Sequence, residues 1–389
     1  MRPGRLDIAY VHYGAQSGVT GAVARALVER GHDLRLVAAT GELEPRDATS
    51  RRPRPHPLVL AHLALAAVRF GRQALQHRWN TTFAWDAHSR RAGQLLRTMR
   101  PAPDIVLQNG ALFAPGLPPP FPYALLLDHT RALGMRGPAW PQAGLPAPAD
   151  YGEGWRRREA QAYRGAALIA TFSEHVAGSL LRDYGVDPAR VRVVGAGANV
   201  FPARAPRRDD GRTILFAGKD FTRKGGTVLL DAFVRLRRQH PKARLLIAGP
   251  PRPPPLPENA FHLGPVPLEE LPGLFSQASV LCVPTLREPF GIAYLDAMAC
   301  GVPCVATRVE AVPEIVADGE TGLLVPPGDP VALASALARL VADPLRARRM
   351  GAAGRARVAS RFLWSHVAER LERALQAAVG ARPAAAQGW

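Results

Sequence analysis

Short apolar runs alternate with helix-like segments along this chain, and the alternation occurs in two rounds. The first round opens with an expected strand over 5–12, a glycine-containing loop over 14–21, and a helix over 22–30 that ends at Gly31. Further strands are expected at 32–40, 104–108, 123–127, 167–171 and 192–194. Such alternation predicts βα units and a parallel sheet.

A polar, basic and proline-containing stretch, residues 197–212, separates the two rounds, and its composition is typical of a linker. The alternation then resumes with TILFAG, a helix from about residue 225, and the apolar runs ARLLIAG, FHLG, SVLCVPT, VPCVAT and GLLVP. The tail over 345–380 has a helical pattern. We therefore predict two successive α/β halves that join near residue 205.

The chain is strongly basic, with 50 Lys and Arg against 32 Asp and Glu in 389 residues, a net charge of +18. This excess favours phosphate-bearing ligands, anionic membranes or nucleic acid as partners. Much of it is arginine, so a compositional habit is an alternative explanation. The hydrophobic share of 47% and the charged share of 21% are ordinary for a folded protein with a buried core.

The cysteines and the longest apolar stretch exclude several classes of protein. Cys282, Cys300 and Cys304 are odd in number, form no CxxC pair and lie in apolar runs. They argue against a disulfide framework or a zinc site, and we expect buried reduced thiols. The N-terminus lacks the apolar core of a signal peptide, and residues 58–68 are too short to span a bilayer. A cytoplasmic protein is predicted.

The segment 51–79 allows two interpretations. Arginines bracket an apolar stretch, and Arg69, Arg72 and Arg78 fall near its end, followed by Trp79. The segment could lie on an anionic membrane surface and bring an enzyme, peripheral at the inner face of the membrane, near a lipid-linked acceptor. Alternatively, it is a buried helix of the first domain with a basic outer face.

The densest chemical signal is PTLREPFGIAYLDAMACGVPCVA, residues 284–306. A strand ends at Pro284, a loop carries Glu288, and a helix starts near Pro289–Gly291, where proline favours a first turn and free backbone N–H groups form an anion site. Asp296 follows Glu288 by eight residues, about 12 Å along a helix axis. Two acids so placed suit a ligand with hydroxyls at both ends and phosphate in the middle.

This segment resembles the E-x7-E signature of family 4 glycosyltransferases, retaining enzymes of GT-B architecture, with Asp296 in place of the second Glu. FAGKDFTRKGGTVLLDAF resembles the family's donor-diphosphate segment, ATFSEHVAGSLLRDYGV its Ser-Glu helix entry, and EIVADGETGLLVPPGDP its closing run. GHDLRLV matches the usual end of the first βαβ unit. The resemblance covers most of the chain, is specific over 213–330 and is weaker in the first half.

The resemblance implies an α/β fold with two Rossmann-like domains that face each other across a cleft. The N-terminal, acceptor-side domain would span 1–205 and the nucleotide-sugar-binding domain 206–361. A C-terminal helix over 362–380 would cross back to the N-terminal domain, and 381–389 would be a frayed tail.

The family's catalytic roles fall on three positions. Lys219 and Lys224 would neutralise the leaving diphosphate, and Glu288 would lie near the donor sugar's hydroxyls and the reacting centre. The backbone N–H groups of Phe290 and Gly291, with Ile292 beside them, would bind sugar or phosphate oxygens. The alternatives are two solvated lysines and a glutamate that only caps a helix.

Further substrate contacts follow from the same resemblance. Asp296 would accept hydrogen bonds from ribose hydroxyls, although it is one methylene shorter than Glu and could instead face solvent. Gly18 would let backbone approach the diphosphate, unless its loop is a simple turn. Asp128 and His129 would contact sugar or acceptor, unless they only cap a strand. The nucleobase contacts would come, mostly through backbone, from Gly249, Leu263 and Pro265.

The predicted reaction moves a sugar from a nucleotide diphosphate sugar to an acceptor hydroxyl of a glycan, lipid-linked or small-molecule acceptor. No DxD triplet occurs, since Asp209 and Asp210 are adjacent in the linker, so no metal and no other cofactor are expected. One alternative is another GT-B enzyme, such as a UDP-sugar 2-epimerase or a phosphorylase. Another is a non-catalytic basic protein that binds nucleic acid or membrane, although no nucleic-acid partner is expected.

Overall fold

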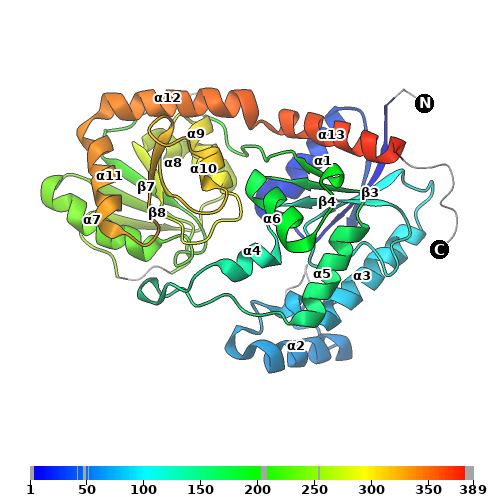
Figure 1. The fold of residues 1–389 in the computed structure, drawn as a ribbon. Coiled ribbons are helices and arrows are strands. Elements are labelled where there is room, and N and C mark those ends of the chain that lie inside the picture. The colour runs from blue at the N-terminus through cyan, green and yellow to red at the C-terminus, as the bar shows by residue number, and fades with distance from the viewer. Residues whose placement is uncertain are drawn as a thin grey trace. The chain divides into compact units, whose positions relative to one another are not determined.

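The computed structural model describes residues 4–41, 43–46, 50, 52–202, 208–252 and 255–381. Their contacts divide the chain into two compact units (Figure 1). The N-terminal unit comprises Met1–Arg136, Ala149–Gly195 and Val367–Trp389, and the C-terminal unit comprises Gly137–Pro148 and Ala196–His366. The main boundary thus precedes the expected one at 205. Residues 203–207 of the expected linker, and the expected tail beyond Ala381, lie outside the described residues.

The sheet of the N-terminal unit has six parallel strands in the order β2-β1-β3-β4-β5-β6. Every residue of β3 and β4 is buried, as near-continuous apolar strands between two helical layers should be. The expected strands are confirmed to within about two residues. Their bounds are β1 (Asp7–His12), β2 (Asp33–Ala38), β3 (Ile105–Asn109), β4 (Tyr123–Leu127), β5 (Leu168–Thr171) and β6 (Val191–Val193).

Helices connect these strands, and local capping defines several of their ends. Ser173 accepts a hydrogen bond from the Val176 N–H at the start of α6, and Gly185 ends that helix in the left-handed conformation. The last helix groups with this unit from Val367 onward. The helices are α1 (Val19–Glu29), α2 (Pro57–Phe70), α3 (Thr82–Arg97), α4 (Arg131–Arg136), α5 (Glu153–Gly165), α6 (Glu174–Tyr184) and α13 (Trp364–Gly380).

Helix α2 is not the buried helix with a basic outer face that the sequence allowed. Val59 and Ala66 on one side are buried, but the opposite side is apolar and open, with Leu60 62% and Val68 88% exposed. Among the described residues, one stretch is apolar and long enough by composition to be a membrane-crossing candidate, Pro57–Arg97. That stretch is interrupted between the end of α2 and the start of α3.

The C-terminal unit holds a second parallel six-stranded sheet, in the order β12-β11-β10-β7-β8-β9. Cys282 and Cys304 lie in its buried strands, and they and Cys300 are free thiols, as predicted. The bounds are β7 (Thr213–Ala217), β8 (Arg244–Ala248), β9 (Ala260–Gly264), β10 (Val280–Val283), β11 (Cys304–Thr307) and β12 (Gly322–Val325).

Helices cover both faces of this second sheet, with α7 and α11 on one side and α8 to α10 on the other (Figure 1). The helical tail expected over 345–380 consists of two helices, separated at Phe362 and Leu363, and the second agrees with the C-terminal helix expected over 362–380 to within about two residues. The helices are α7 (Gly226–Gln239), α8 (Leu271–Gln277), α9 (Ile292–Ala299), α10 (Val312–Ile315), α11 (Pro330–Ala342) and α12 (Pro344–Arg361).

The strand order of the C-terminal sheet reverses between β7 and β10. From β7 the chain moves to β8 and β9 on one side, then returns to place β10 on the other side of β7. In doubly wound sheets, ligands bind outside the carboxyl ends of the strands at such a reversal. The loops after β7 and β10 are therefore where a site is expected.

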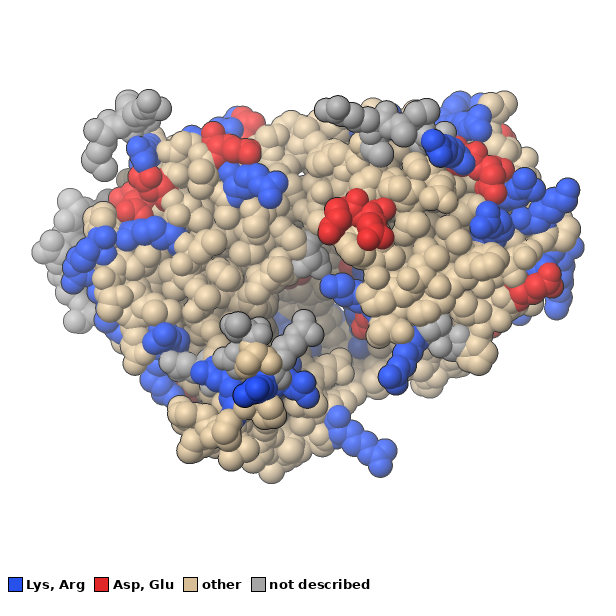
Figure 2. All heavy atoms as spheres, turned by 180° about the vertical axis from the view of Figure 1, so that it is seen from behind, with Lys and Arg blue, Asp and Glu red and all other residues tan. Residues whose placement is uncertain are grey.

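Basic side chains are spread over the outer surface of both units, as Figure 2 shows for one face. Some form ion pairs, such as Arg158 with Asp86 and Arg35 with Asp7. Because cations outnumber acids, the rest of the positive charge is available to partners or solvent.

Candidate active site

The loops that follow β7, β8 and β10 pack against one another through glycines. A Cβ atom on Gly225 would lie 1.9 Å from the carbonyl oxygen of Pro284, and Gly225 has a φ of 72°. A Cβ on Gly249 would lie 2.7 Å from the carbonyl group of Gly218. No side chain fits at these two positions. Glycine at both therefore lets the backbone after β7 contact the backbone after β10 and after β8.

Hydrogen bonds join the loop after β7 to the loop after β10. The Arg223 guanidinium donates to the carbonyl oxygen of Arg287 at 2.8 Å, and the Leu286 N–H donates to the carbonyl oxygen of Arg223 at 2.9 Å. The Thr285 hydroxyl also donates to the Arg287 carbonyl oxygen, at 2.9 Å. The two loops therefore form one structural element. Arg223 was missed from the sequence, since in so arginine-rich a chain its residue type carries no signal.

Lys224 and Glu288 meet in this element, at the reversal of strand order. The Lys224 ammonium donates a hydrogen bond to a Glu288 carboxylate oxygen in an ion pair, and only 13% and 6% of the two side chains are exposed. The Glu288 backbone N–H donates to the Glu310 carboxylate at 2.7 Å. The structure thus brings the predicted residues Lys224 and Glu288 together beside Glu310, which was not predicted from the sequence. The one feature that could have indicated Glu310 is its position shortly after the neighbouring strand β11.

The start of α9 lies directly after Glu288. Gly291 caps the helix with a φ of 113°, where a Cβ would lie 2.6 Å from the Tyr294 ring. Phe290 is buried, and Ile292 is the first helical residue. The first N–H groups of any α-helix lack partners within the helix, so this end attracts negative charge. The predicted anion site therefore lies next to the Lys224–Glu288 pair.

Asp296 is buried on α9 rather than facing solvent, so the solvent-facing alternative is wrong. One of its carboxylate oxygens accepts the backbone N–H groups of Asn199 at 2.6 Å and Val200 at 3.0 Å. Burial raises the pKa of this carboxyl to about 7, although the two backbone hydrogen bonds act in the opposite direction. Asp296 therefore holds the backbone at Asn199 and Val200 against α9.

This raised pKa predicts a pH dependence of stability. The folded protein binds the Asp296 proton more tightly than the unfolded chain, so its stabilising contribution is complete below about pH 4 and is lost as the pH rises to about 7. We expect Asp296→Asn to remove a slope of about 1.4 kcal/mol per pH unit within that window. Denaturant unfolding of both proteins between these pH values checks it, and parallel curves would contradict it.

The other predicted residues of the C-terminal unit lie along the same sheet edge. Lys219 is exposed and directly follows Gly218, whose N–H donates to the Ala248 carbonyl oxygen. The Gly249 N–H donates to the Gly264 carbonyl oxygen at 2.7 Å. This bond places Gly249 beside the end of β9, where the predicted residues Leu263 and Pro265 lie, both exposed.

The predicted residues of the N-terminal unit lie at the carboxyl edge of its sheet. Gly18, with a φ of 86°, caps α1 after β1. Asp128 is exposed and His129 half-buried, directly after β4. Because all six strands are parallel, these positions share one edge of the sheet. Both a binding role and the simpler turn and strand-cap roles remain predictions for these three residues.

A buried carboxylate that the sequence did not reveal supports the segment after His129. Glu159 on α5 accepts the Arg131 N–H at 3.0 Å and the hydroxyls of Tyr163 at 2.8 Å and Tyr184 at 2.6 Å. Burial raises the pKa of Glu159, and these hydrogen bonds oppose the rise. Glu159 therefore fixes the start of α4. The feature of the sequence that could have indicated Glu159 is an acidic residue on the apolar face of a predicted helix.

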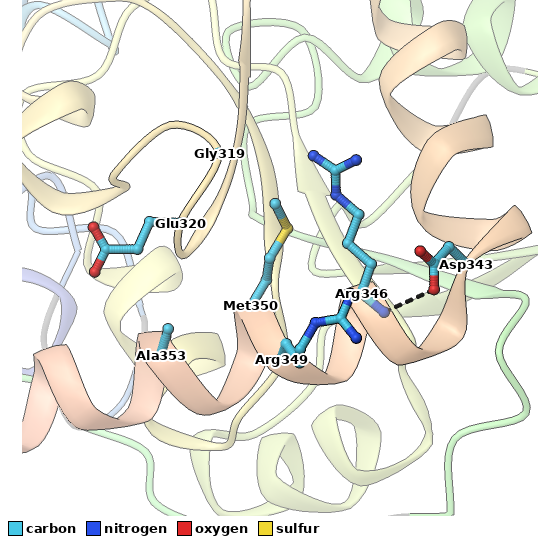
Figure 3. Close-up of a pocket in the computed structure, with 7 residues that line it drawn as sticks. All are labelled: Gly319, Glu320, Asp343, Arg346, Arg349, Met350 and Ala353. Atoms are coloured by element: carbon cyan, nitrogen blue, oxygen red, sulfur yellow. Dashed lines mark hydrogen bonds between the residues drawn. The ribbon is translucent and has the colours of Figure 1, made fainter.

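A pocket elsewhere on the C-terminal unit contains none of the predicted residues. It has a volume of about 440 Å³ and lies at the start of α12, where Asp343 accepts the Arg346 N–H at 2.9 Å (Figure 3). Its lining residues are Gly319, Glu320, Asp343, Arg346, Arg349, Met350 and Ala353. The hydrogen bond from the Arg346 N–H to Asp343 caps the start of α12, which forms one side of the pocket.

Comparison with known families addresses what this edge of the C-terminal sheet is for. The family described as "Glycosyl transferases group 1" matches residues 211–343, which include Lys219, Lys224, Glu288 and Asp296. Residues 211–343 of the chain thus match the group 1 glycosyltransferases. This match, with the similar enzymes described next, confirms the resemblance and the transferase activity predicted from the sequence, and it does not favour the epimerase, phosphorylase or non-catalytic alternatives.

Similar enzymes extend the match to most of the chain. The MMP alpha-(1->4)-mannosyltransferase of Mycolicibacterium hassiacum is 29% identical over 387 residues, covering 92% of this transferase and 93% of that enzyme. The D-inositol 3-phosphate glycosyltransferase of Streptomyces bingchenggensis is 34% identical over 270 residues. That second match covers 62% of this chain and only 58% of the relative.

A solved structure supports the predicted architecture. Anabaena Alr3699/HepE, in complex with UDP-glucose, superimposes with a TM-score of 0.66 and 15% identity, covering 96% of this chain and all of that one. At this identity the likeness concerns the fold alone. Together with the two parallel six-stranded sheets, it confirms the GT-B fold class predicted from the sequence.

Proposed function

We propose that this glycosyltransferase moves a sugar from a nucleotide diphosphate sugar to an acceptor hydroxyl, with retention at the anomeric carbon and without a metal ion. The observation that carries the proposal is the Lys224–Glu288 pair. It lies at the strand-order reversal of the C-terminal sheet and next to the start of α9. Cation, acid and helix N-terminus together match a ligand with a diphosphate joined to a sugar.

The known binding partner of a structural neighbour supports a nucleotide-sugar donor. Anabaena Alr3699/HepE has been solved with UDP-glucose. Two similar enzymes are named as a mannosyltransferase and an inositol-phosphate glycosyltransferase, so transfer of a hexose is the simplest proposal for this chain. Its acceptor is proposed only as a hydroxyl compound.

In the proposed reaction, the bond from the anomeric carbon to the diphosphate oxygen breaks while the acceptor oxygen bonds to the same face of that carbon. The acceptor's proton passes to the departing diphosphate oxygen. Negative charge therefore grows on the diphosphate in the transition state, and Lys224, Lys219 and the N–H groups at the start of α9 would stabilise it.

Glu288 would have a different task from the lysines. Its carboxylate, paired with Lys224, would accept hydrogen bonds from the donor sugar's hydroxyls, while its backbone N–H donates to Glu310 and fixes the main chain there. Phe290, Gly291 and Ile292 would offer backbone groups, Asp296 would bind the ribose, and Gly249, Leu263 and Pro265 would contact the base. From the N-terminal unit, Gly18, Asp128 and His129 would contact diphosphate, sugar or acceptor.

Two observations support metal independence. The sequence has no DxD triplet. Within the ranges that the structure describes, no group of three His, Cys, Asp or Glu side chains is arranged to hold a metal ion. Two lysines and a helix N-terminus would supply the positive charge that a divalent ion supplies in metal-dependent transferases.

The proposal is tested with a panel of nucleoside diphosphate sugars and EDTA. We expect at least one donor to raise the melting temperature by a few degrees, about what ligand binding at many times Kd produces. We also expect EDTA to leave both the shift and the turnover of that donor unchanged. Turnover that requires Mg²⁺ or Mn²⁺ would overturn metal independence. A panel without any shift would contradict donor binding, and release of an epimerised nucleotide would favour the epimerase.

A further inference from the structure

Helix α2 presents an apolar face that the described residues of its own unit leave exposed. The side chains of Leu58, Leu65 and Val68 follow one stripe of the helix and are 46%, 45% and 88% exposed. Leu60 and, just beyond the helix, Leu75 are 62% and 64% exposed. Single exposed apolar residues are ordinary, but five of them in one short segment mark an interaction surface.

The opposite face of α2 already packs against the unit. Val59, His62 and Ala66 are buried, and the His62 ring stacks on Phe83 with 6.4 Å between ring centroids. The helix is therefore anchored by one side, and its open side is not a core face that awaits other parts of the same unit.

Positive charge surrounds the exposed face. Arg52 and Arg54 precede the helix and Arg69 and Arg72 lie at its end, all four exposed, although Arg69 also pairs with Asp150 at 3.5 Å. The sequence has no Asp or Glu from residue 48 to residue 85. In Figure 2, the lobe at the lower edge of the molecule, where α2 lies in Figure 1, is largely uncharged, with basic side chains gathered beside it.

The length of α2 shows whether this helix could cross a bilayer or would lie on its surface. Helix α2 has 14 residues and ends at Phe70, where Gly71 follows with a φ of 53°. At 1.5 Å per residue it is about 21 Å long, shorter than the roughly 30 Å hydrocarbon core of a bilayer. A helix of this length, with one apolar open face and basic ends, lies in the plane of the lipid headgroups.

We propose that the α2 surface, formed by Leu58, Leu60, Leu65, Val68 and Leu75 with Arg52, Arg54, Arg69 and Arg72, docks this transferase on the surface of an anionic phospholipid bilayer. The leucines and valine enter the boundary between headgroups and acyl chains. The arginines bind the lipid phosphates around them.

The charges favour lipid over a second copy of this chain. A symmetric dimer pairs the same patch on both subunits, so it would bring two sets of arginines together without an acid in the segment to offset them. Nucleic acid offers phosphates but leaves the leucines in water. An anionic bilayer satisfies both the charge and the apolar area.

The test is sedimentation of the full-length protein with vesicles. Vesicles of mixed phosphatidylcholine and phosphatidylglycerol are compared with phosphatidylcholine alone. We expect binding to the anionic vesicles that weakens as salt rises, and weak binding to the neutral ones. Leu65→Ser with Val68→Ser should reduce the anionic binding at least about 10-fold. Arg52→Glu with Arg72→Glu should do the same.

The control removes two equally exposed apolar side chains from the C-terminal unit. Val331 and Leu345 are 61% and 65% exposed, and Val331→Ser with Leu345→Ser should leave vesicle binding unchanged. Because all these positions are exposed, every variant should melt within a few degrees of the parent protein.

Three outcomes would overturn the proposal: no binding to anionic vesicles, an equal loss in the control, or dissociation of a dimer by the α2 variants in sedimentation velocity. The readout involves neither donor nor turnover. Failure of this proposal is therefore distinct from failure of the proposed reaction.

Discussion

Lys224→Ala is expected to lower kcat/KM for sugar transfer by about 10²–10³-fold, the usual effect of removing one preorganised group that stabilises transition-state charge. Lys224 is the cation that the structure places against Glu288, the acid that precedes the α9 N-terminus. Its removal also leaves the largely buried Glu288 carboxylate without its ion-pair partner, so some loss of stability accompanies the loss of activity.

A matched lysine separates the two effects. Lys242 is exposed in the same unit, between α7 and β8, and Lys242→Ala should retain parental activity and stability. Steady-state kinetics and thermal unfolding are measured for both variants. Activity of Lys224→Ala within about threefold of the parent, in a folded protein, would remove the diphosphate role from this residue.

The choice of lysine at this site is itself informative. Only three of the 50 basic residues are lysine, and Lys219 and Lys224 are two of them. An ammonium group is a compact point charge on a flexible stem, whereas the planar guanidinium of arginine favours paired hydrogen bonds. Two lysines in an arginine-rich chain, both in one glycine-rich loop, are therefore what the proposed diphosphate role predicts.

The fold could largely be predicted because each strand of these parallel sheets is a short apolar run between turn residues. The expected strand over 123–127 agrees with β4 residue for residue. The Lys224–Glu288 pair was also predictable in part, since motif resemblance assigned both residues to the donor site. Their direct contact was not, because the residues are 64 positions apart and the ion pair depends on three loops folding together.

What could not be predicted depends on long-range backbone contacts. The partners of Asp296 are the N–H groups of Asn199 and Val200, which every residue type except proline offers, so no pattern marks them. The segment 137–148 falls within the N-terminal domain that was expected over 1–205. It groups with the C-terminal unit because Arg287 donates to two of its carbonyl oxygens, those of Pro138 and Pro146.

The glycines that allow the site to form should be the most sensitive positions for stability. Gly225→Ala should destabilise the protein by at least about 4 kcal/mol, a size reserved for a severe steric or backbone defect. The added Cβ would lie 1.9 Å from the carbonyl oxygen of Pro284, a backbone atom that cannot move without displacing the end of β10. Donor binding should be lost with the loop.

Gly319→Ala isolates the conformational part of that cost. Gly319 has a φ of 80°, close to the 72° of Gly225, but a Cβ there meets no atom within 4 Å. Its substitution should therefore lower the free energy of unfolding only by what a residue with a Cβ loses in the left-handed conformation, about 1–2 kcal/mol. Denaturant unfolding measures both variants. If the two losses were equal, the tight contact between the loops after β7 and β10 would not be what holds Lys224 beside Glu288, and the site would have to be assembled by side-chain contacts alone.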